Sequence, residues 1–362
     1  MDRDDRPDPP PDPPGGEATP RSDEAGLEEA PPTVRDSRTP SSSGRAPSGI
    51  RLRQRDILAG RFRVVRFIAR GGMGSIYEAE DLELGERVAI KTLRPDIAQD
   101  DEVLARFRRE INLARRVTHP NVCRIFDLFH HRVAGETEED DDEIVFLVME
   151  LLDGQTLAER IRTKGPFSTK EAMPIVRQVA SALDAAHRAS IVHRDFKSAN
   201  IILVPSGDGA DAPRAVITDF GIARSLSVEG SEQSELTAAG GVLGTPAYVA
   251  PEQLTGGTIT PAVDVYSFGV VLYEMVTGAR PFSGDSPFAM AAKRLREAPV
   301  PPKTRVKDLD PRWNDAILKC LEREPTKRFA SAGDIAAALE GSGAIPTTGL
   351  RSARHRQAAA AA

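Results

Sequence analysis

The spacing of apolar residues changes near the middle of the chain, and this change limits the folds that the chain can adopt. Before about residue 150, apolar and polar residues alternate, as in RFRVVRFIAR at 61–70, which is typical of strands with one buried face. One stretch in this part, at 101–117, repeats its apolar residues every three or four positions and predicts a helix. From Thr156 onward the helical spacing dominates. The sequence therefore predicts an α+β fold in two lobes, a small antiparallel-sheet lobe with one helix and a larger, mainly helical lobe.

The same patterns place the individual elements. Further strands are expected at 75–81, 86–93, 121–129 and 143–151, and helices at 168–188, 262–277, 286–297, 311–322 and 331–339. The acidic run ETEEDDDE at 136–143 interrupts two strands and indicates an exposed loop. A cleft between two lobes is a common place for a ligand site, so polar residues near this junction are the first candidates for function.

The two ends of the chain lack the apolar residues that a core requires. Residues 1–55 consist mostly of Pro, Asp, Glu, Ser, Gly and Arg, and residues 342–362 end in five alanines. Such segments bury too little apolar surface to offset the entropy lost on ordering, so we expect two disordered or flexible tails. The chain between them is expected to divide into an N-terminal lobe at 56–151 and a C-terminal lobe at 152–341.

Composition narrows the partners and the compartment. The net charge of -6 gives no general reason to expect nucleic acid as a partner, although arginines crowd the predicted helix at 101–117. No apolar run is long enough to cross a bilayer, and the first residues do not resemble a signal peptide. Cys123 and Cys320 suit buried thiols in a reducing compartment, with one disulfide as the alternative. We expect a cytoplasmic protein with no membrane span and no nucleic-acid partner.

Two features of the first lobe could bind an anion. ARGGMGSIYEA places glycines between two strands, where backbone N–H groups can approach a phosphate closely, although an ordinary glycine-rich turn is the plainer interpretation. Lys91 stands in the middle of the apolar strand VAIK and needs a counter-charge or a route to solvent. Glu110 lies at the edge of the apolar stripe of the predicted helix, so it points partly inward. We expect a Lys91–Glu110 ion pair that fixes the ammonium for a phosphate contact.

The segment IVHRDFKSANIIL at 191–203 concentrates charged and polar residues between two apolar runs. Asp195, Lys197 and Asn200 share this segment, and Asp219 follows a further strand in VITDFGIAR. A carboxylate and a carboxamide from two turns are oxygen ligands of the kind that Mg²⁺ accepts, with phosphate supplying the rest. Asp195 could then accept a proton from a hydroxyl group or orient that group, and Lys197 could neutralise a transferred phosphoryl group.

Together these motifs resemble those of a known family. From about Ile57 to Leu339 the chain resembles a eukaryotic-type serine/threonine protein kinase domain of the kind found in bacteria. The glycine-rich loop, VAIK, a helix glutamate, HRD-x-K-x-x-N, DFG and APE occur in the order of that family. Six segments in one order are far more specific than any of them alone.

The resemblance implies an ATP site between the lobes. Residues of the first lobe and of the segment that follows it would surround the nucleotide: Ile68, Gly71, Gly72, Gly74, Ile76, Ala89, Lys91, Met149, Glu150 and Leu152. The glycines would form a flap over the phosphates, and Lys91 would contact the α- and β-phosphates. Met149 would be the gatekeeper, and Glu150 and Leu152 would offer backbone groups to adenine.

The resemblance also implies the catalytic residues. Asp195 would be the base, Lys197 would contact the γ-phosphate, and Glu110 would hold the lysine of VAIK. Asn200 and Asp219 would bind Mg²⁺ or Mn²⁺.

Other matching residues would be architectural. Asp264 resembles the helix aspartate that ties down the catalytic loop, and Glu252 of APE would pair with Arg328. His193 is expected to be structural.

The substrate class follows from two matching stretches. Lys197 and GTPAYVAPE at 244–252 resemble the serine/threonine pattern rather than the tyrosine pattern, which implies protein substrates modified on Ser or Thr. Arg194 could pair with a phosphate in the segment between the DFG and APE motifs. We expect activation by phosphorylation there, with Thr237 as the site and a transient homodimer for trans-autophosphorylation.

Three positions depart from the family pattern. Ala69 replaces the first glycine of the flap, Phe196 replaces leucine and Ser198 replaces proline, and none of these changes removes a charged group. The alternatives to an active protein kinase are a pseudokinase that binds nucleotide or partners without turnover, and a small-molecule phosphotransferase. The retained charged residues argue against the first, and GTPAYVAPE argues against the second.

Overall fold

The computed structural model describes residues 52–72, 74–133, 142–207, 212–220, 247–284 and 286–341, all within the unit Pro47–Ala362. The predicted tail at 342–362, most of the tail at 1–55 and most of the acidic loop lie outside the described residues. Leu52 lies within the predicted N-terminal tail but is buried together with Leu58 and Phe62. The packed chain therefore begins before residue 56, because one leucine in an otherwise polar stretch reaches the core.

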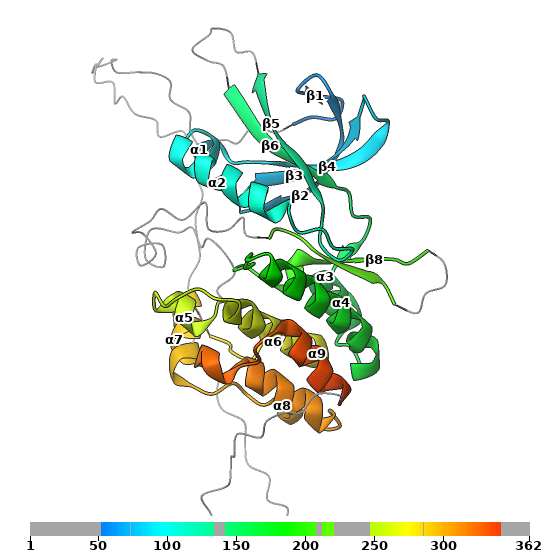
Figure 1. The fold of residues 1–362 in the computed structure, drawn as a ribbon. Helices are drawn as coiled ribbons and strands as arrows, with labels where there is room; N and C mark the ends of the chain where they lie inside the picture. Colours follow the sequence, from blue (N-terminus) through cyan, green and yellow to red (C-terminus); the bar gives the residue numbers. More distant parts are fainter. Residues whose placement is uncertain are drawn as a thin grey trace, which may run out of the picture. The chain divides into compact units, whose positions relative to one another are not determined.

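A six-stranded antiparallel sheet forms the first lobe, in the order β1-β2-β3-β4-β6-β5 (Figure 1). Its strands are β1 (Ile57–Leu58), β2 (Phe62–Gly71), β3 (Gly74–Asp81), β4 (Glu86–Thr92), β5 (Ile125–Val133) and β6 (Asp142–Glu150). Helix α2 (Asp101–Ala114) packs on one face, and the short helix α1 (Pro95–Ala98) precedes it. The predicted lobe is confirmed, with α1 as one turn of helix that the sequence analysis did not anticipate.

The alternation of side chains along β6 explains how this sheet is buried on both sides. Val145 and Leu147 belong to a core cluster with Phe107 of α2. Phe146 and Val148 belong to a separate, partly aromatic cluster. Successive residues of a strand point to opposite faces, so β6 contributes to two cores at once.

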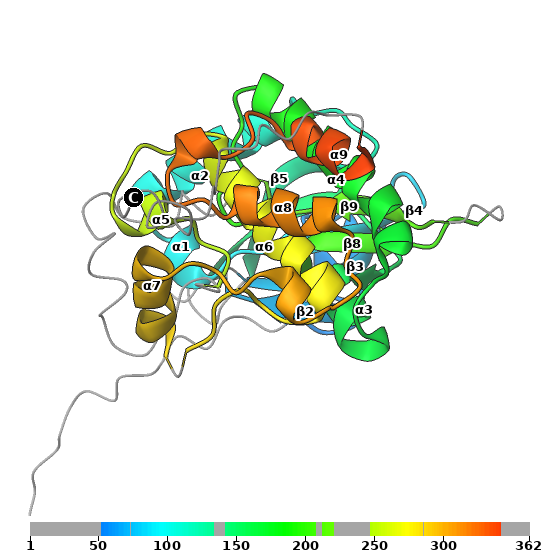
Figure 2. The same cartoon turned by 90° about the horizontal axis from the view of Figure 1, so that it is seen from below.

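The second lobe is mainly helical. Its helices are α3 (Leu157–Lys164), α4 (Thr169–Arg188), α5 (Pro251–Leu254), α6 (Ala262–Thr277), α7 (Pro287–Arg296), α8 (Pro311–Cys320) and α9 (Ala332–Glu340). Helix α6 is buried on nearly all sides and packs against α4 and α8 (Figure 2). Capping boxes at Ser168 and Ser331 begin α4 and α9. The predicted helical lobe is confirmed.

A small sheet, in the order β7-β8-β9, carries the loops that hold the polar motifs. Its strands are β7 (Gln155–Thr156), β8 (Ile201–Val204) and β9 (Arg214–Ile217), paired antiparallel, with Ile201 opposite Ile217. Strand β8 begins directly after Asn200, and β9 ends two residues before Asp219. This register therefore brings Asn200 and Asp219 to the same end of the sheet.

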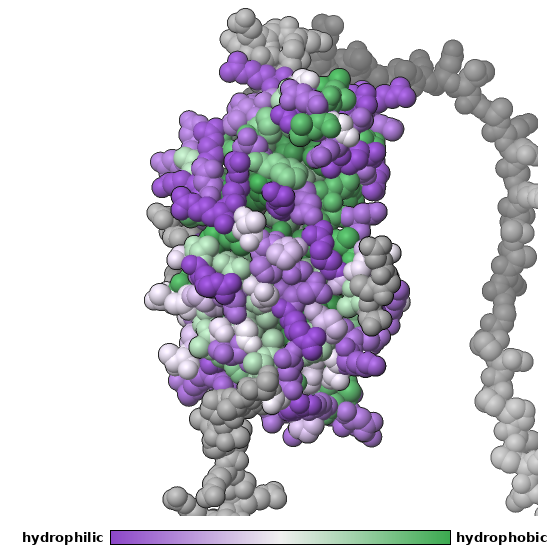
Figure 3. Space-filling model, turned by 45° about the vertical axis from the view of Figure 1, so that its right-hand side comes forward, coloured by the Kyte–Doolittle hydropathy of each residue, from purple (hydrophilic) through white to green (hydrophobic). Residues whose placement is uncertain are grey.

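Hydrophilic side chains cover most of the face of the molecule that Figure 3 shows.

Cys320 is buried, Cys123 is half-buried, and both thiols are free, so the alternative of a disulfide is not realised. Within the described ranges, no helix is both long enough and apolar enough to cross a bilayer.

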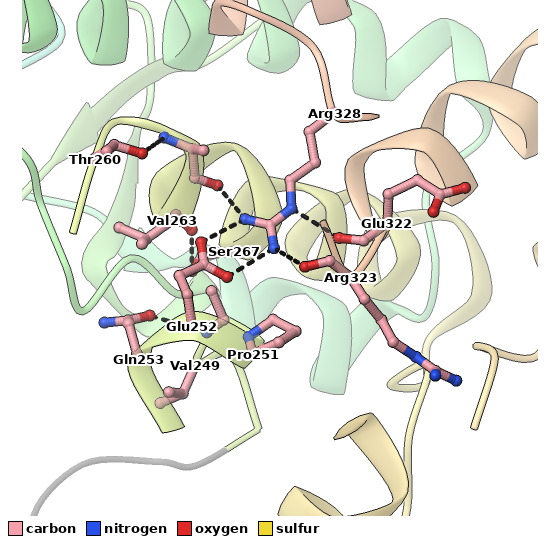
Figure 4. A network of polar contacts seen from close by, with 12 residues as sticks. Val249, Pro251, Glu252, Gln253, Thr260, Val263, Ser267, Glu322, Arg323 and Arg328 are labelled. Atoms are coloured by element: carbon pink, nitrogen blue, oxygen red, sulfur yellow. Dashed lines mark hydrogen bonds and ion pairs between the residues drawn. The ribbon is translucent and has the colours of Figure 1, made fainter. Parts of the chain in front are cut away.

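A buried ion pair ties together three parts of the helical lobe. Arg328 donates from Nη1 and Nη2 to the two carboxylate oxygens of Glu252, at 2.6 and 2.7 Å (Figure 4). The same guanidinium donates to the backbone carbonyl groups of Ala262, Glu322 and Arg323. The two side chains are 0% and 9% exposed, so the pair lies out of water. The predicted Glu252–Arg328 pair is confirmed, and its bidentate geometry is the strong form of this contact.

Replacing Arg328 by alanine should destabilise the protein strongly, because it would leave the Glu252 carboxylate charged and unpaired in the interior. We expect a loss of about 3–5 kcal/mol in the free energy of unfolding, measured by urea denaturation. Lys327→Ala is the control, since Lys327 makes an exposed ion pair with Glu324, and it should leave the unfolding midpoint unchanged. Equal effects of the two substitutions would contradict an architectural role for the buried pair.

Candidate active site

The small sheet brings the two predicted metal ligands together. Thr218 donates its backbone N–H to the carbonyl oxygen of Asn200 at 2.9 Å, and its hydroxyl group lies 3.3 Å from the same oxygen. Asp219 is the next residue along the chain. The Asn200 carboxamide and the Asp219 carboxylate therefore project from adjacent segments of backbone, as the sequence analysis expected.

Asp195 and Lys197 form a close ion pair in the same loop. Lys197 Nζ donates to Asp195 Oδ2 at 2.6 Å, and the side chains are 17% and 27% exposed. Asn200 Nδ2 donates to the backbone carbonyl of Asp195 at 2.9 Å and lies 3.5 Å from Asp195 Oδ2. The carboxylate of Asp195 is thus oriented by an amine and an amide, while part of it stays open to solvent, where an acceptor hydroxyl group could reach it.

The buried carboxylate of Asp264 fixes the backbone of this loop through two hydrogen bonds. Asp264 is 0% exposed in α6, and its two oxygens accept the N–H groups of His193 and Arg194 at 2.8 and 2.9 Å. His187 Nε2, at the end of α4, lies 2.7 Å from Asp264 Oδ2. The expected role of Asp264 is confirmed. His187 was missed, because a polar residue near the end of a predicted helix carries no sign of the carboxylate that it contacts.

His193 makes contacts that suit a structural residue. Its Nε2 lies 3.0 Å from the carbonyl oxygen of Thr218, and its ring centroid lies 4.7 Å from Phe220 and 5.5 Å from Phe196. The side chain is buried, so it packs the catalytic loop against the DFG segment instead of facing a substrate.

Two residues of the site have a strained backbone. Arg194 and Asp219 have φ angles of +66° and +63°, in the left-handed region that L-residues other than glycine avoid. Such conformations cost about 1–3 kcal/mol each and persist only where the surrounding structure enforces them. The hydrogen bond from Arg194 N–H to Asp264 supplies one such restraint.

Lys91 connects the two lobes. It is 4% exposed in β4, and its Nζ donates to Asp219 Oδ1 at 2.7 Å. Its partner is therefore Asp219 and not Glu110, which corrects the pairing expected from the sequence. The Glu110 carboxylate instead lies 3.8 Å from Arg194 Nη1. A buried ammonium takes the carboxylate that the backbone brings closest, and the spacing along the chain does not reveal which one that is.

The charge of Asp219 depends on this contact. Burial by itself would raise the pKa of Asp219, but the charge of Lys91 and its hydrogen bond outweigh burial and lower the pKa below the usual range. The carboxylate is therefore ionised at neutral pH, as a metal ligand must be.

The predicted adenine residues lie on neighbouring strands. Ala89 of β4 is buried, pairs in register with Met149 of β6 and has Glu78 of β3 on its other side. Ile76 of β3 pairs with Lys91. Ile76 thus lies beside the buried lysine, and Ala89 and Met149 form the next row, two residues along the strands. The three residues make a band of two rows across β3, β4 and β6.

The remaining predicted nucleotide residues lie at the edges of this band. Ile68 of β2 is 39% exposed, and Leu152 follows β6 and is half-buried. The side chain of Glu150 is engaged in an ion pair, because Arg214 Nη2 lies 2.8 Å from its Oε1. Its backbone N–H donates to the carbonyl oxygen of Arg124 at 2.9 Å, and its own carbonyl oxygen lies 3.8 Å from Cys123 Sγ.

The glycine-rich turn leaves no room for a side chain at Gly74, whereas a Cβ atom at Gly72 would meet no other atom within 4 Å. Gly71 pairs with Gly74 at the end of the β2–β3 hairpin, with Gly72 in the turn between them. A Cβ atom at Gly74 would lie 1.7 Å from the carbonyl oxygen of Thr92. Glycine is therefore required at this position by close packing of the backbone.

The donor set fits a hard divalent cation that shares its ligands with phosphate. Asn200 and Asp219 offer a carboxamide and an ionised carboxylate at one end of the small sheet. Among the residues that the structure describes, no three His, Cys, Asp or Glu side chains gather into a self-sufficient metal site. Mg²⁺ is commonly held by one or two protein oxygens together with substrate phosphates, so the residues present fit a metal that arrives with a nucleotide.

The fold and this constellation define a class of protein. Residues 62–339 match the family described as "Protein kinase domain", and the chain belongs to that family. Crystal structures of the PknI kinase domain from Mycobacterium tuberculosis have the same fold, with a TM-score of 0.59, 27% identity, and coverage of 81% of this chain and 100% of that one.

Named relatives place the chain more narrowly. It is 39% identical over 282 residues to the serine/threonine-protein kinase PknA of Mycobacterium tuberculosis strain H37Rv, which covers 78% of this chain and 61% of that protein. It is 38% identical over 282 residues to the serine/threonine-protein kinase PknB of Mycolicibacterium smegmatis, which covers 78% of this chain and 43% of that protein. The chain thus spans about half the length of these relatives.

Proposed function

We propose that the protein is a serine/threonine protein kinase that transfers the γ-phosphate of ATP to hydroxyl groups of proteins. The observation that carries the proposal is the convergence of Lys91 and Asp219, from different lobes, beside the Asp195–Lys197 pair. Phosphoryl transfer requires mainly positioning and neutralisation of charge, and this set provides two cations, two carboxylates and one amide. The relatives named as serine/threonine-protein kinases support the choice of Ser and Thr as acceptors.

Each residue has a role that follows from its chemistry. Asp195 orients the acceptor hydroxyl group and takes its proton, and Lys197 neutralises charge on the phosphoryl group in transit. Lys91 binds the α- and β-phosphates. Asn200 and Asp219 hold Mg²⁺ or Mn²⁺, which neutralises charge between the phosphates.

The nucleotide occupies the band of residues on β3, β4 and β6. Ile68, Ile76 and Ala89 enclose the adenine ring, with Met149 behind it, and the backbone of Glu150 and of Leu152 provides hydrogen bonds. The turn of Gly71, Gly72 and Gly74 covers the phosphates. In this arrangement 56–151 is the N-terminal lobe and 152–341 the C-terminal lobe. ATP as donor and the two free thiols fit the reducing cytoplasm.

The contacts of Glu110 and Lys91 suggest a resting state of the enzyme. Glu110 lies beside Arg194, and Lys91 is engaged by Asp219. A phosphate on the segment between DFG and APE would compete for Arg194 and release Glu110 to hold Lys91. Thr237, the expected site, lies outside the described residues. Modification in trans would require a transient homodimer.

A pseudokinase remains the alternative in a different functional class. It would bind nucleotide without transfer, and no contact in the described residues favours it. Lys91, Asp195, Asn200 and Asp219 are all present, and Asp195, the proposed base, would be dispensable in a scaffold that only binds nucleotide.

Transfer of phosphate should depend on both Asp195 and Lys91. Purified protein is incubated with labelled ATP, Mg²⁺ and histone as a generic basic acceptor. We expect label on Ser or Thr in the parent protein and a loss of at least about 100-fold for Asp195→Asn, because a positioned base contributes about 10²–10⁴-fold. Lys91→Ala should be similarly impaired, and Lys327→Ala should match the parent. Nucleotide binding without any transfer in the parent would establish the scaffold instead.

Phosphorylation between residues 225 and 245 should accompany activity. Mass spectrometry of the active protein should find phosphate at Thr237, and treatment with a phosphatase should lower the rate of transfer to histone. Thr237→Ala should respond little to the phosphatase. Active protein without a modified residue in this range would rule out the proposed activation.

A further inference from the structure

A chain of buried hydrogen bonds connects the HRDFKSAN segment to the GTPAYVAPE segment. Ser198 Oγ lies 2.9 Å from Tyr248 OH, and Tyr248 OH donates to Glu274 Oε2 at 2.5 Å. Ser198 and Tyr248 are 1% and 4% exposed. Water therefore has little access to these groups, and a partner that is removed cannot readily be replaced.

The direction of each hydrogen bond follows from the chemistry of the groups. The Glu274 carboxylate only accepts, so the single proton of Tyr248 is committed to it. The oxygen of Tyr248 then accepts, and Ser198 is the donor. Arg280 lies beside this pair, since its Nε is 3.9 Å from Glu274 Oε1 and its guanidinium lies over the Tyr248 ring. Burial and the nearby Glu274 raise the pKa of Tyr248, so its proton stays in place.

Ser198 lies at a position where the chain departs from the expected family pattern. Ser198 opens the short helical turn Ser198–Asn200, directly after Lys197 and two residues before the proposed metal ligand. The family resemblance leads one to expect proline here, and proline has no hydroxyl group with which to contact Tyr248. The serine thus adds a link that the expected residue could not make.

Tyr248 belongs to a segment that is fixed from several sides. Arg294 of α7 donates to the carbonyl oxygens of Ala247 and Val249, each at 2.8 Å. Ser267 of α6 donates to the carbonyl oxygen of Tyr248 at 2.9 Å. These bonds hold the backbone to α6 and α7. The bond from Ser198 is different, since it holds the side chain to the loop that carries Asp195 and Lys197.

We propose that Ser198 is a positioning residue for the acceptor protein. Its hydrogen bond to Tyr248 fixes the GTPAYVAPE segment, where the acceptor would dock, to the loop that carries Asp195 and Lys197. This inference rests on the proposed kinase activity. It predicts that Ser198 influences how the acceptor binds relative to Asp195 and has little influence on ATP, because the Ser198 hydroxyl group contacts Tyr248 while other side chains, Lys197 and Asn200 of the same loop among them, would contact the nucleotide and its metal.

The first test separates the two substrates. Steady-state kinetics with ATP and histone are measured for the parent, Ser198→Ala and Ser198→Pro. Both variants should raise the KM for histone by about 2- to 10-fold, which corresponds to the loss of one buried hydrogen bond. The KM for ATP should stay within about 2-fold of the parent, because no nucleotide contact is changed. Proline should resemble alanine, since both lack the hydroxyl group.

The second test asks whether the effect passes through Tyr248. In a Tyr248→Phe background, Ser198→Ala should add nothing further to the KM for histone, because the acceptor of the Ser198 bond is already absent. Ser267→Ala is the matched control. Ser267 is also buried and contacts the same residue, but through a backbone carbonyl that phenylalanine retains. Its effect should therefore be the same in both backgrounds.

The outcomes distinguish this inference from the proposed function. A parent protein that transfers no phosphate overturns the proposed function and this inference with it. An active parent in which Ser198→Ala leaves the KM for histone unchanged, raises both KM values alike, or acts additively with Tyr248→Phe overturns the role of Ser198 alone. Thermal unfolding of each variant shows whether a change in KM reflects loss of folded protein.

Discussion

The hydrogen-bonded ion pair between Lys91 and Asp219 is the contact on which the functional part of the structure depends. It joins residues 128 positions apart, one in the middle of β4 and the other just beyond β9, across the junction of the lobes. The Lys91 side chain is only 5% exposed, so its charge would be costly to leave unpaired, and the 26% exposed Asp219 carboxylate supplies the partner. The pair therefore fixes where the lobes meet and leaves a cation and a carboxylate ready in the same place.

The residues around this pair are held from the helical side by buried polar groups. Asp264 accepts the N–H groups of two successive loop residues, and Arg328 ties the segment after α8 to Glu252. These restraints can maintain the strained backbone at Arg194 and Asp219, which would relax in a loop that had only solvent around it. The helical lobe thus restrains this loop through buried hydrogen bonds, while the activation proposed above would change the contact between Glu110 and Arg194.

The sequence predicted the fold well because apolar periodicity records which face of an element is buried. It predicted the antiparallel lobe and the helices, while the resemblance to the protein kinase family implied the Glu252–Arg328 pair. It did not predict the partner of Lys91, because several carboxylates lie within reach of a buried ammonium and the choice depends on how the lobes sit together. The bond between Ser198 and Tyr248 was equally invisible, since a hydroxyl group in a sequence carries no sign of its acceptor.

Calorimetric titration of ATP into the parent protein and Asp219→Asn, with and without Mg²⁺, tests the central claim most directly. If Lys91 and Asp219 share one crevice around a metal-bound nucleotide, Mg²⁺ should increase the affinity of the parent for ATP. Asp219→Asn should still bind ATP but should lose most of the gain from Mg²⁺, because an amide replaces the ionised ligand. The same gain from Mg²⁺ in both proteins, or no binding of ATP to the parent, would contradict the account.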